Sequence, residues 1–182
     1  GAIHINNSEY VEINNCLIDN NSADGTTGGG GLIATNSEIN INNTIISNNT
    51  SIQGGAIKLI SSNIEISESS ILNNRANHRG GGIHASSSSD VSIYNSIISE
   101  NEAILDLGGA IELNGSNGVI HDCQILRNFA SNTSGVAVIG NSNLDLQRSV
   151  LAYNIAGSQG RGVIHVHSSS SFASIGNDPQ DL

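Results

Sequence analysis

The side chains able to carry acid–base or covalent chemistry are few in this 182-residue chain and are spread along its length. They include six basic residues, six histidines and two cysteines. Cleaving a polysaccharide requires paired carboxylates, or a calcium ion beside an Arg or Lys that acts as base. The nearest approach to such a set is Asp122, followed five residues later by Arg127. The sequence therefore predicts no catalytic residue, no cofactor and no metal ligand.

The charge balance argues against two classes of partner. The chain carries 16 Asp and Glu against six Lys and Arg, which gives a formal net charge of −10. A nucleic-acid partner requires a basic surface that displaces counterions from phosphate, and an anionic membrane surface also attracts basic segments. No apolar run approaches the ~18 residues of a membrane-spanning helix. We therefore expect no nucleic-acid partner and no direct insertion into a membrane.

Modification of asparagine is a further chemistry that the sequence offers. The Asn-x-Ser/Thr sequon occurs seven times, and a chain so rich in Asn and Ser contains several by chance. In a secreted eukaryotic protein, sequons in outward turns are the candidates for N-glycosylation. The candidate positions are Asn132, Asn114, Asn6 and Asn48. Asn49 also begins a sequon, but we expect its side chain to face inward and to remain unmodified.

A repeat that runs through the whole chain must position all of these residues. Aligned on one glycine per turn, the sequence repeats every 25 to 29 residues. The turns open near residues 1, 30, 55, 81, 109, 135 and 162. Self-similarity at such a period indicates a solenoid, in which each repeat packs only against its neighbours. We expect a single repeat domain over residues 1–182 that is a segment of a longer chain.

The aliphatic residues of each turn predict the fold. In the third turn they include Ile57 and Leu59 after the glycine pair, then Ile66 and Ile71. Apolar residues at every second position mark a strand with one buried face. Propeller blades need ~40 residues or more, and the spacing of a leucine-rich repeat does not occur here. The pattern predicts an all-β parallel β-helix with about three short strands per turn and six to seven turns, stacked about 4.8 Å apart.

One asparagine recurs at the same position of six turns. The column comprises Asn21, Asn49, Asn74, Asn101, Asn128 and Asn154. Asparagine tolerates left-handed backbone, and stacked amides can donate to and accept from one another. We expect these residues to form a structural ladder at a bend of each turn. The Gly-Gly pair is expected at the other sharp corner, where a Cβ would clash or φ must be positive.

Stacking the turns separates the residues that could otherwise react or bind together. Cys16 and Cys123 share a column but lie four turns apart, about 19 Å, beyond the ~7 Å between Cα atoms that a disulfide allows. We expect two separate buried thiols. Lys58, His84 and Glu112 are expected to stack on adjacent turns as an exposed ladder of charges.

The outward carboxylates do not predict a calcium site. Glu12, Glu65 and Asp145 share one column without occupying adjacent turns, and Asn63 separates Glu38 from Asp90 in another. Calcium requires six or more oxygen ligands that converge on one point.

Two motifs connect this repeat to a known family. Gly-Gly-Ala-Ile occurs at residues 54–57 and 108–111, and aliphatic-x-x-Asn occurs at residues 71–74 and 98–101. Together they resemble the repeat of the polymorphic outer membrane proteins of chlamydia-like bacteria, where Phe stands in place of the aliphatic residue. The resemblance covers about six turns. It implies a right-handed β-helix that forms the adhesive, surface-exposed part of a secreted protein.

Two hypotheses for function follow. The first is an extracellular or cell-surface rod, structural or adhesive, with no active site, because the strong sequence signals all serve stacking. Its partners would be further copies of the chain, joined end to end, or glycans and proteins of a host or neighbouring cell surface. The second is a polysaccharide-active enzyme of pectate-lyase type, or a glycan-binding module, on the same fold. An acidic groove beside an Arg would favour the second.

Overall fold

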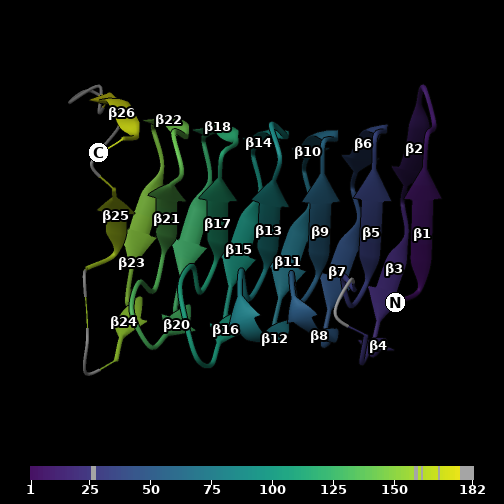
Figure 1. Ribbon diagram of the computed structural model, residues 1–182, viewed down its shortest axis with the longest axis horizontal. Coiled ribbons are helices and arrows are strands. Elements are labelled where there is room, and N and C mark those ends of the chain that lie inside the picture. Colours follow the sequence, from purple (N-terminus) through teal and green to yellow (C-terminus); the bar gives the residue numbers. More distant parts are fainter. Residues whose placement is uncertain (26–27, 158–159, 161, 168, 177–182) are drawn as a thin grey trace.

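The computed structural model describes residues 1–25, 28–157, 160, 162–167 and 169–176. All the regular secondary structure of these residues is β-strand, and the strands form four parallel sheets. Figure 1 shows the turns in a single row, from the purple first turn at one end to the yellow β25 at the other. The expected all-β parallel β-helix is confirmed.

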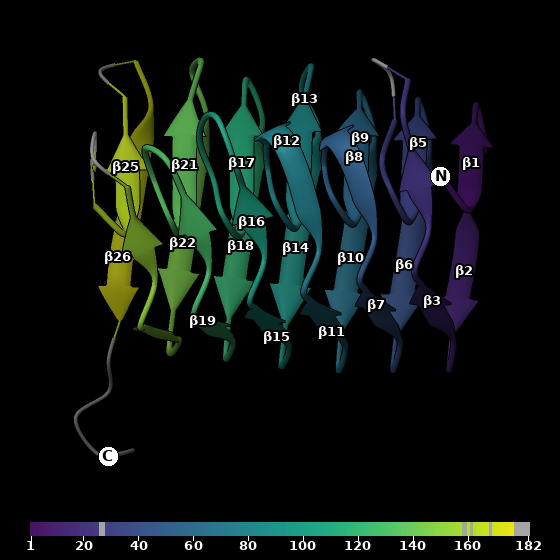
Figure 2. The ribbon, with the colours of Figure 1, turned by 90° about the horizontal axis from the view of Figure 1, so that it is seen from below.

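The first two sheets, A and B, have seven strands each. Sheet A contains β1 (Ile3–Asn6), β5 (Leu32–Thr35), β9 (Ile57–Ile60), β13 (Ile83–Ser86), β17 (Ile111–Asn114), β21 (Val136–Ile139) and β25 (Ile164–Val166). Sheet B contains β2 (Val11–Asn14), β6 (Glu38–Asn42), β10 (Asn63–Ser67), β14 (Asp90–Tyr94), β18 (Asn117–His121), β22 (Asn143–Gln147) and β26 (Ser171–Gly176). Figure 2 shows the strands of these two sheets pointing in opposite directions within each turn.

The other two sheets, C and D, have six shorter strands each. Sheet C contains β3 (Leu17–Asp19), β7 (Ile45–Ser47), β11 (Ser70–Leu72), β15 (Ile97–Ser99), β19 (Gln124–Leu126) and β23 (Val150–Ala152). Sheet D contains β4 (Ser22–Ala23), β8 (Thr50–Gln53), β12 (Arg75–Arg79), β16 (Glu102–Ala103), β20 (Phe129–Ala130) and β24 (Ile155–Ala156). The strands of sheet D follow the asparagine column. They give each of the first six turns a fourth strand, where the sequence pattern predicted about three.

The core is a set of aliphatic columns that run along the stack. In sheet B, Ile41 pairs with Ile66, and Ile66 pairs with Ile93 one turn later, each fully buried. Because equivalent residues of successive turns pair in register, each inward side chain packs against the equivalent side chains of the turns before and after it. Each fully buried aliphatic side chain contributes roughly 1.5–3 kcal/mol. Stability therefore accumulates across the interfaces between turns.

The bends use left-handed backbone at a position different from the one expected. The residue before each ladder asparagine has positive φ, as at Asn73 (φ 54°) and Arg127 (φ 53°). The ladder residue itself is absent from the positive-φ positions, so the left-handed residue of this bend is the one before the ladder asparagine. A second left-handed corner joins sheet B to sheet C, as at Asn43 (φ 45°) and Glu68 (φ 49°).

The glycine pair makes a crowded corner, as the sequence predicts. Gly54, Gly80 and Gly108 all have φ between 59° and 69°. At the next position the backbones of successive turns approach closely: a Cβ on Gly81 would lie 2.4 Å from the carbonyl oxygen of Gly109. Only glycine fits both requirements without strain.

The segment before each glycine pair continues the stack. Gln53 pairs with Arg79, and Leu107 forms a bridge with Thr133. Gln53 and Arg79 also contact side chains that sheet A points away from the core. Both faces of sheet A are therefore buried over its middle strands, as the burial of all four side chains at Ile57, Lys58, Ile83 and His84 shows.

Candidate functional site

The asparagine column forms an interior ladder of hydrogen bonds. Asn74 Nδ2 donates to Asn101 Oδ1 at 3.0 Å and to the carbonyl oxygen of Ile46 at 2.9 Å. Asn101 Oδ1 also accepts from the backbone N–H of Asn74 at 3.0 Å. The same pattern links all six members of the column: Asn21, Asn49, Asn74, Asn101, Asn128 and Asn154. The four middle members are fully buried.

Two further ladders of hydroxyl groups were not recognised from the sequence as hydrogen-bonding ladders. In one, the backbone N–H of Ser69 donates to Ser96 Oγ at 3.0 Å, and Ser96 Oγ donates to Tyr94 O at 2.7 Å. In the other, the backbone N–H of Ser62 donates to Ser89 Oγ at 3.1 Å. These serines stand at the ends of strands, where the backbone N–H would otherwise lack a partner. A recurring small polar residue just before a strand is the signal that could have identified them.

The row formed by Lys58, His84 and Glu112 is buried, which corrects the expectation of an exposed charge ladder. The three residues pair in register on β9, β13 and β17, with exposures of 6%, 4% and 0%. The row is buried because the segment before the glycine pair, which we call the covering segment, lies over sheet A and contacts it through Gln53 and Arg79.

The charges of this buried row have partners from the covering segment. Arg79 donates to Asp106 Oδ2 at 2.9 Å and to Glu112 Oε1 at 3.4 Å. Lys58 Nζ donates to the amide oxygen of Gln53 at 2.8 Å, and burial lowers the pKa of this lysine. His84 Nδ1 lies 3.7 Å from Glu112 Oε2, too far for a hydrogen bond. An amine, an imidazole and a carboxylate are thus aligned, but they lie under protein rather than in a cleft.

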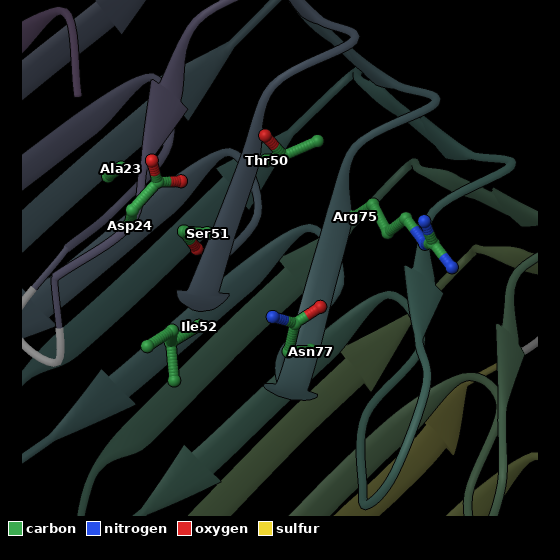
Figure 3. Close-up of a pocket in the computed structure, with 7 residues that line it drawn as sticks. All are labelled: Ala23, Asp24, Thr50, Ser51, Ile52, Arg75 and Asn77. Carbon is green, nitrogen blue, oxygen red and sulfur yellow. The ribbon is translucent and has the colours of Figure 1, made fainter.

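A shallow depression lies on the outer face of sheet D, across β4, β8 and β12 (Figure 3). Asp24, Thr50, Arg75 and Asn77 give it polar groups, and its volume is about 310 Å³. Arg75 Nε pairs with a carboxylate oxygen of Glu102 on the next turn at 3.0 Å. In Figure 3 the Asp24 carboxylate and the Arg75 guanidinium point in different directions. The set has the polar character of a sugar-binding surface, at the lower limit of ligand-site volumes.

The outer face of sheet B carries the acidic columns that the sequence indicated. Asn63 pairs with Glu38 and with Asp90, so an amide separates these carboxylates along the stack. Tyr10 Oη donates to Glu12 Oε1 at 3.0 Å in the first turn, and Glu65 is also exposed. We call the surface formed by Tyr10, Glu12, Glu38, Glu65 and Asp90 the acidic face. Among the described residues, no three or more His, Cys, Asp or Glu come together as metal ligands.

The two cysteines differ in exposure. Both are free thiols; Cys123 is buried, as expected, but Cys16 is exposed. Cys16 belongs to the first turn, so its column has a neighbour on one side only.

Asp122 pairs with Arg148 at 2.7 Å, and the guanidinium lowers the pKa of this carboxyl. The basic partner of Asp122 is therefore Arg148 on the next turn and not Arg127, which follows Asp122 five residues later in the sequence.

The four candidate glycosylation positions are unequally accessible. Asn6 and Asn48 are exposed, whereas Asn114 and Asn132 are half-buried. The Oδ1 atom of Asn132 is buried without a hydrogen-bond partner. Glycosylation needs an accessible amide nitrogen, and this favours the exposed Asn6 over the half-buried Asn114 and Asn132. Asn48 Nδ2 already donates to Asp19 at 2.7 Å. Asn49 is fully buried.

Comparison with protein families gives one match. The family model described as a right-handed beta helix region matches residues 1–178. Its description agrees with the right-handed coil that the repeat motifs implied. Comparison with curated proteins and with solved structures gave no match. Within the described residues, no helix is long and apolar enough to cross a membrane.

Proposed function

The chain belongs to the family of right-handed β-helix regions, and we propose that it serves as a rigid extracellular scaffold, structural or adhesive, without catalysis of its own. The observation that carries this proposal is the asparagine ladder, which hydrogen-bonds every turn to the next from Asn21 to Asn154. The resemblance of its motifs to the repeat of polymorphic outer membrane proteins supports a place at the cell surface. Its partners on this proposal are further copies of the chain, or glycans and proteins of another surface.

Rigidity follows from how the interior is bonded. Each of the first six turns is held by backbone pairing in four sheets, by aliphatic stacking and by three side-chain ladders. Buried hydrogen bonds that are fully satisfied make an arrangement unique, because breaking one leaves a desolvated polar group. A rod of this kind can hold the binding surfaces of successive turns at a fixed spacing.

The acidic face supplies an adhesive surface. Exposed carboxylates and amides alternate on sheet B, as Glu38, Asn63 and Asp90 illustrate. Such a surface suits a partner with cationic groups or with hydroxyl groups that donate hydrogen bonds. The formal charge of −10 extends this preference over the molecule and keeps copies apart outside specific contacts.

Two measurements test the scaffold proposal. Antibodies raised against residues 1–182 should label intact source cells without permeabilisation, and beads coated with the protein should adhere to cells. Replacing Glu38 and Glu65 by Gln should reduce adhesion without changing the circular dichroism spectrum. Labelling only after permeabilisation would contradict the extracellular location. Cleavage of a polysaccharide by the purified chain would contradict the non-catalytic role.

A second candidate function is glycan binding at the sheet D depression. Asp24, Asn77 and Arg75 line it together, the combination of acid, amide and guanidinium that recognises sugar hydroxyls and carboxylates (Figure 3). A glycan array probed with the wild-type chain and with Arg75→Ala tests this candidate. Signals lost in Arg75→Ala but kept in the matched variant Arg148→Ala support it. Signals that are equal in all three proteins exclude it.

A further inference from the structure

The outer face of sheet C presents an aliphatic side chain in every turn. In the first strand of sheet C, Ile18 is buried between the exposed Leu17 and Asp19. The strands from β7 to β19 have the same alternation, except that Ser47 and Ser99, at the third positions of β7 and β15, are also buried. The outward aliphatic residues, one or more per turn, are Leu17, Ile45, Leu72, Ile97, Leu126, Val150 and Ala152. The most exposed are Leu17 at 66%, Val150 at 55% and Ile45 at 45%. We call this set the aliphatic stripe.

The stripe is continuous because adjacent strands are only about 4.8 Å apart. Ile45 pairs with Ser70, and Leu72 stands two residues along the same strand from Ser70. The outward aliphatic residue therefore occupies the first position of the strand in some turns and the third position in others. Side chains of the stripe in adjacent turns remain close enough to contact one another. Over six turns the stripe extends about 24 Å from first to last strand.

The other outer faces differ from this one. The covering segment buries the middle of sheet A, and the acidic face occupies sheet B. Sheet D carries the polar residues of the depression together with Ile52 and, at its end, the exposed Ile155. An apolar strip repeated in every turn of a chain with net charge −10 is the kind of surface that marks a protein contact.

We propose that two copies of this chain pair through their aliphatic stripes, face to face and antiparallel. The two-fold axis lies parallel to the strands, between the third and fourth turns. Such an isologous contact places the first turn opposite the partner's sixth turn and the second opposite its fifth. Leu17 then faces the partner's Val150, and Ser70 faces the partner's Ile97. The inference goes beyond the scaffold proposal and does not require an extracellular location.

The charges beside the stripe fit this arrangement and favour a second copy as the occupant. Arg127, exposed and stacked on the Tyr153 ring at 5.7 Å, has no acidic partner among the described residues. On the two-fold arrangement it lies opposite Asn48, whose amide donates to Asp19 Oδ1 at 2.7 Å. Arg127 of each copy thereby reaches the exposed carboxylate of Asp19 in the other.

On this arrangement, no like charges face each other at the left-handed corners on either side of sheet C. Glu68 lies opposite Asn95, and Glu100 lies opposite Asn73, so each exposed acid at a left-handed corner faces an amide. A two-fold axis along the stack would instead set each turn against its own equivalent, so Arg127 of the fifth turn would lie four turns from the partner's Asp19 in the first turn. Because the strands are short, the contact area falls below the 1,200–2,000 Å² typical of stable complexes. The pairing is therefore weak and reversible.

Sedimentation velocity from low micromolar to millimolar protein tests the pairing. The wild-type chain should form a dimer reversibly, and Ile45→Lys with Ile97→Lys should weaken it by at least about tenfold. Leu105→Lys is the matched control, because Leu105 is 61% exposed but lies outside sheet C. A wild-type chain that stays monomeric throughout, or a dimer unaffected by the two sheet C substitutions, overturns the proposal.

A charge exchange tests the direction of pairing. Asp19→Arg alone and Arg127→Asp alone should each weaken the dimer, and the double variant should restore it. Both side chains are exposed, so circular dichroism should show the folded state in every variant. A double variant as weak as the single variants would contradict the antiparallel arrangement. These outcomes are measured on purified protein, so they are independent of whether the adhesive role holds.

Discussion

Burial by neighbouring turns gives the two thiols different chemistry. Cys123 is enclosed in its column, and burial raises the pKa of its thiol to about 11. The thiolate is the reactive form, so this cysteine stays inert near neutral pH. Cys16 belongs to the first turn and is exposed. The same column position therefore yields one protected and one accessible sulfur.

We expect a thiol-specific reagent at pH 8 to modify one cysteine of the folded chain rapidly and both after denaturation. Cys16→Ser should remove the rapid reaction, and Cys123→Ser should leave it unchanged. Titration with a chromogenic disulfide, followed by mass spectrometry, measures both. Rapid modification of Cys123 in the folded chain would show that the interior opens more readily than the ladders imply.

Lys58 is a buried residue whose charge its surroundings disfavour. Burial lowers its pKa below the ordinary value of 10.5. Between the lowered pKa and 10.5 the unfolded chain binds more protons than the folded one, so stability increases as pH rises through this window. Below the lowered pKa both states are protonated, and the cost of burying the cation is fully present.

Replacing Lys58 by Met should therefore stabilise the chain by about 1 kcal/mol at pH 7, because it removes a desolvated cation. The difference from wild type should shrink as the pH approaches 10.5. Urea unfolding at pH 7 and pH 10 measures it. Arg75→Met, which removes an exposed cation, should show no comparable pH dependence. A destabilised Lys58→Met at pH 7 would mean that the bond to Gln53 outweighs the cost of burial.

At the scale of elements, the asparagine ladder makes adjacent turns depend on one another. Asn101 accepts two hydrogen bonds from Asn74 through Oδ1 and donates to Ile71 O at 2.9 Å. Removing this amide leaves a buried N–H and a buried carbonyl without partners. Each such orphaned group costs about 1–3 kcal/mol.

Asn101→Ala should accordingly lower the unfolding free energy by about 3–5 kcal/mol, through lost hydrogen bonds and a small cavity. Asn73→Ala, one turn earlier at an exposed left-handed corner, should cost much less. Urea titration followed by circular dichroism compares the two. Equal effects would indicate that the corner, rather than the interior ladder, holds the turns together.

The elements also show what the sequence could and could not predict. The aliphatic and asparagine columns were visible because identical side chains recur at fixed spacing, which is what stacking in register requires. The burial of Lys58, His84 and Glu112 was not visible, because it depends on the segment before the glycine pair, whose length varies between turns. The aliphatic stripe of sheet C was also missed, since its members alternate between two positions and no single column is wholly apolar.

At the scale of the whole molecule, function depends on the stack being continuous. Each outer face is a set of columns, and a column exists only if every turn follows the last in register. The acidic face, the sheet D depression and the aliphatic stripe all require this. A shift of one residue in any turn would exchange inward and outward side chains from there onward.

Distances between spin labels along the outer face of sheet B test this continuity most directly. Glu12, Asn40 and Asp145 belong to one outward column, in the first, second and sixth turns. In a background without cysteine, labels at residues 12 and 145 should lie about 24 Å apart, and labels at 40 and 145 about 19 Å apart. Two narrow distributions that differ by about one strand spacing, 4.8 Å, are the predicted result. Broad distributions, or equal distances for the two pairs, would contradict a continuous stack.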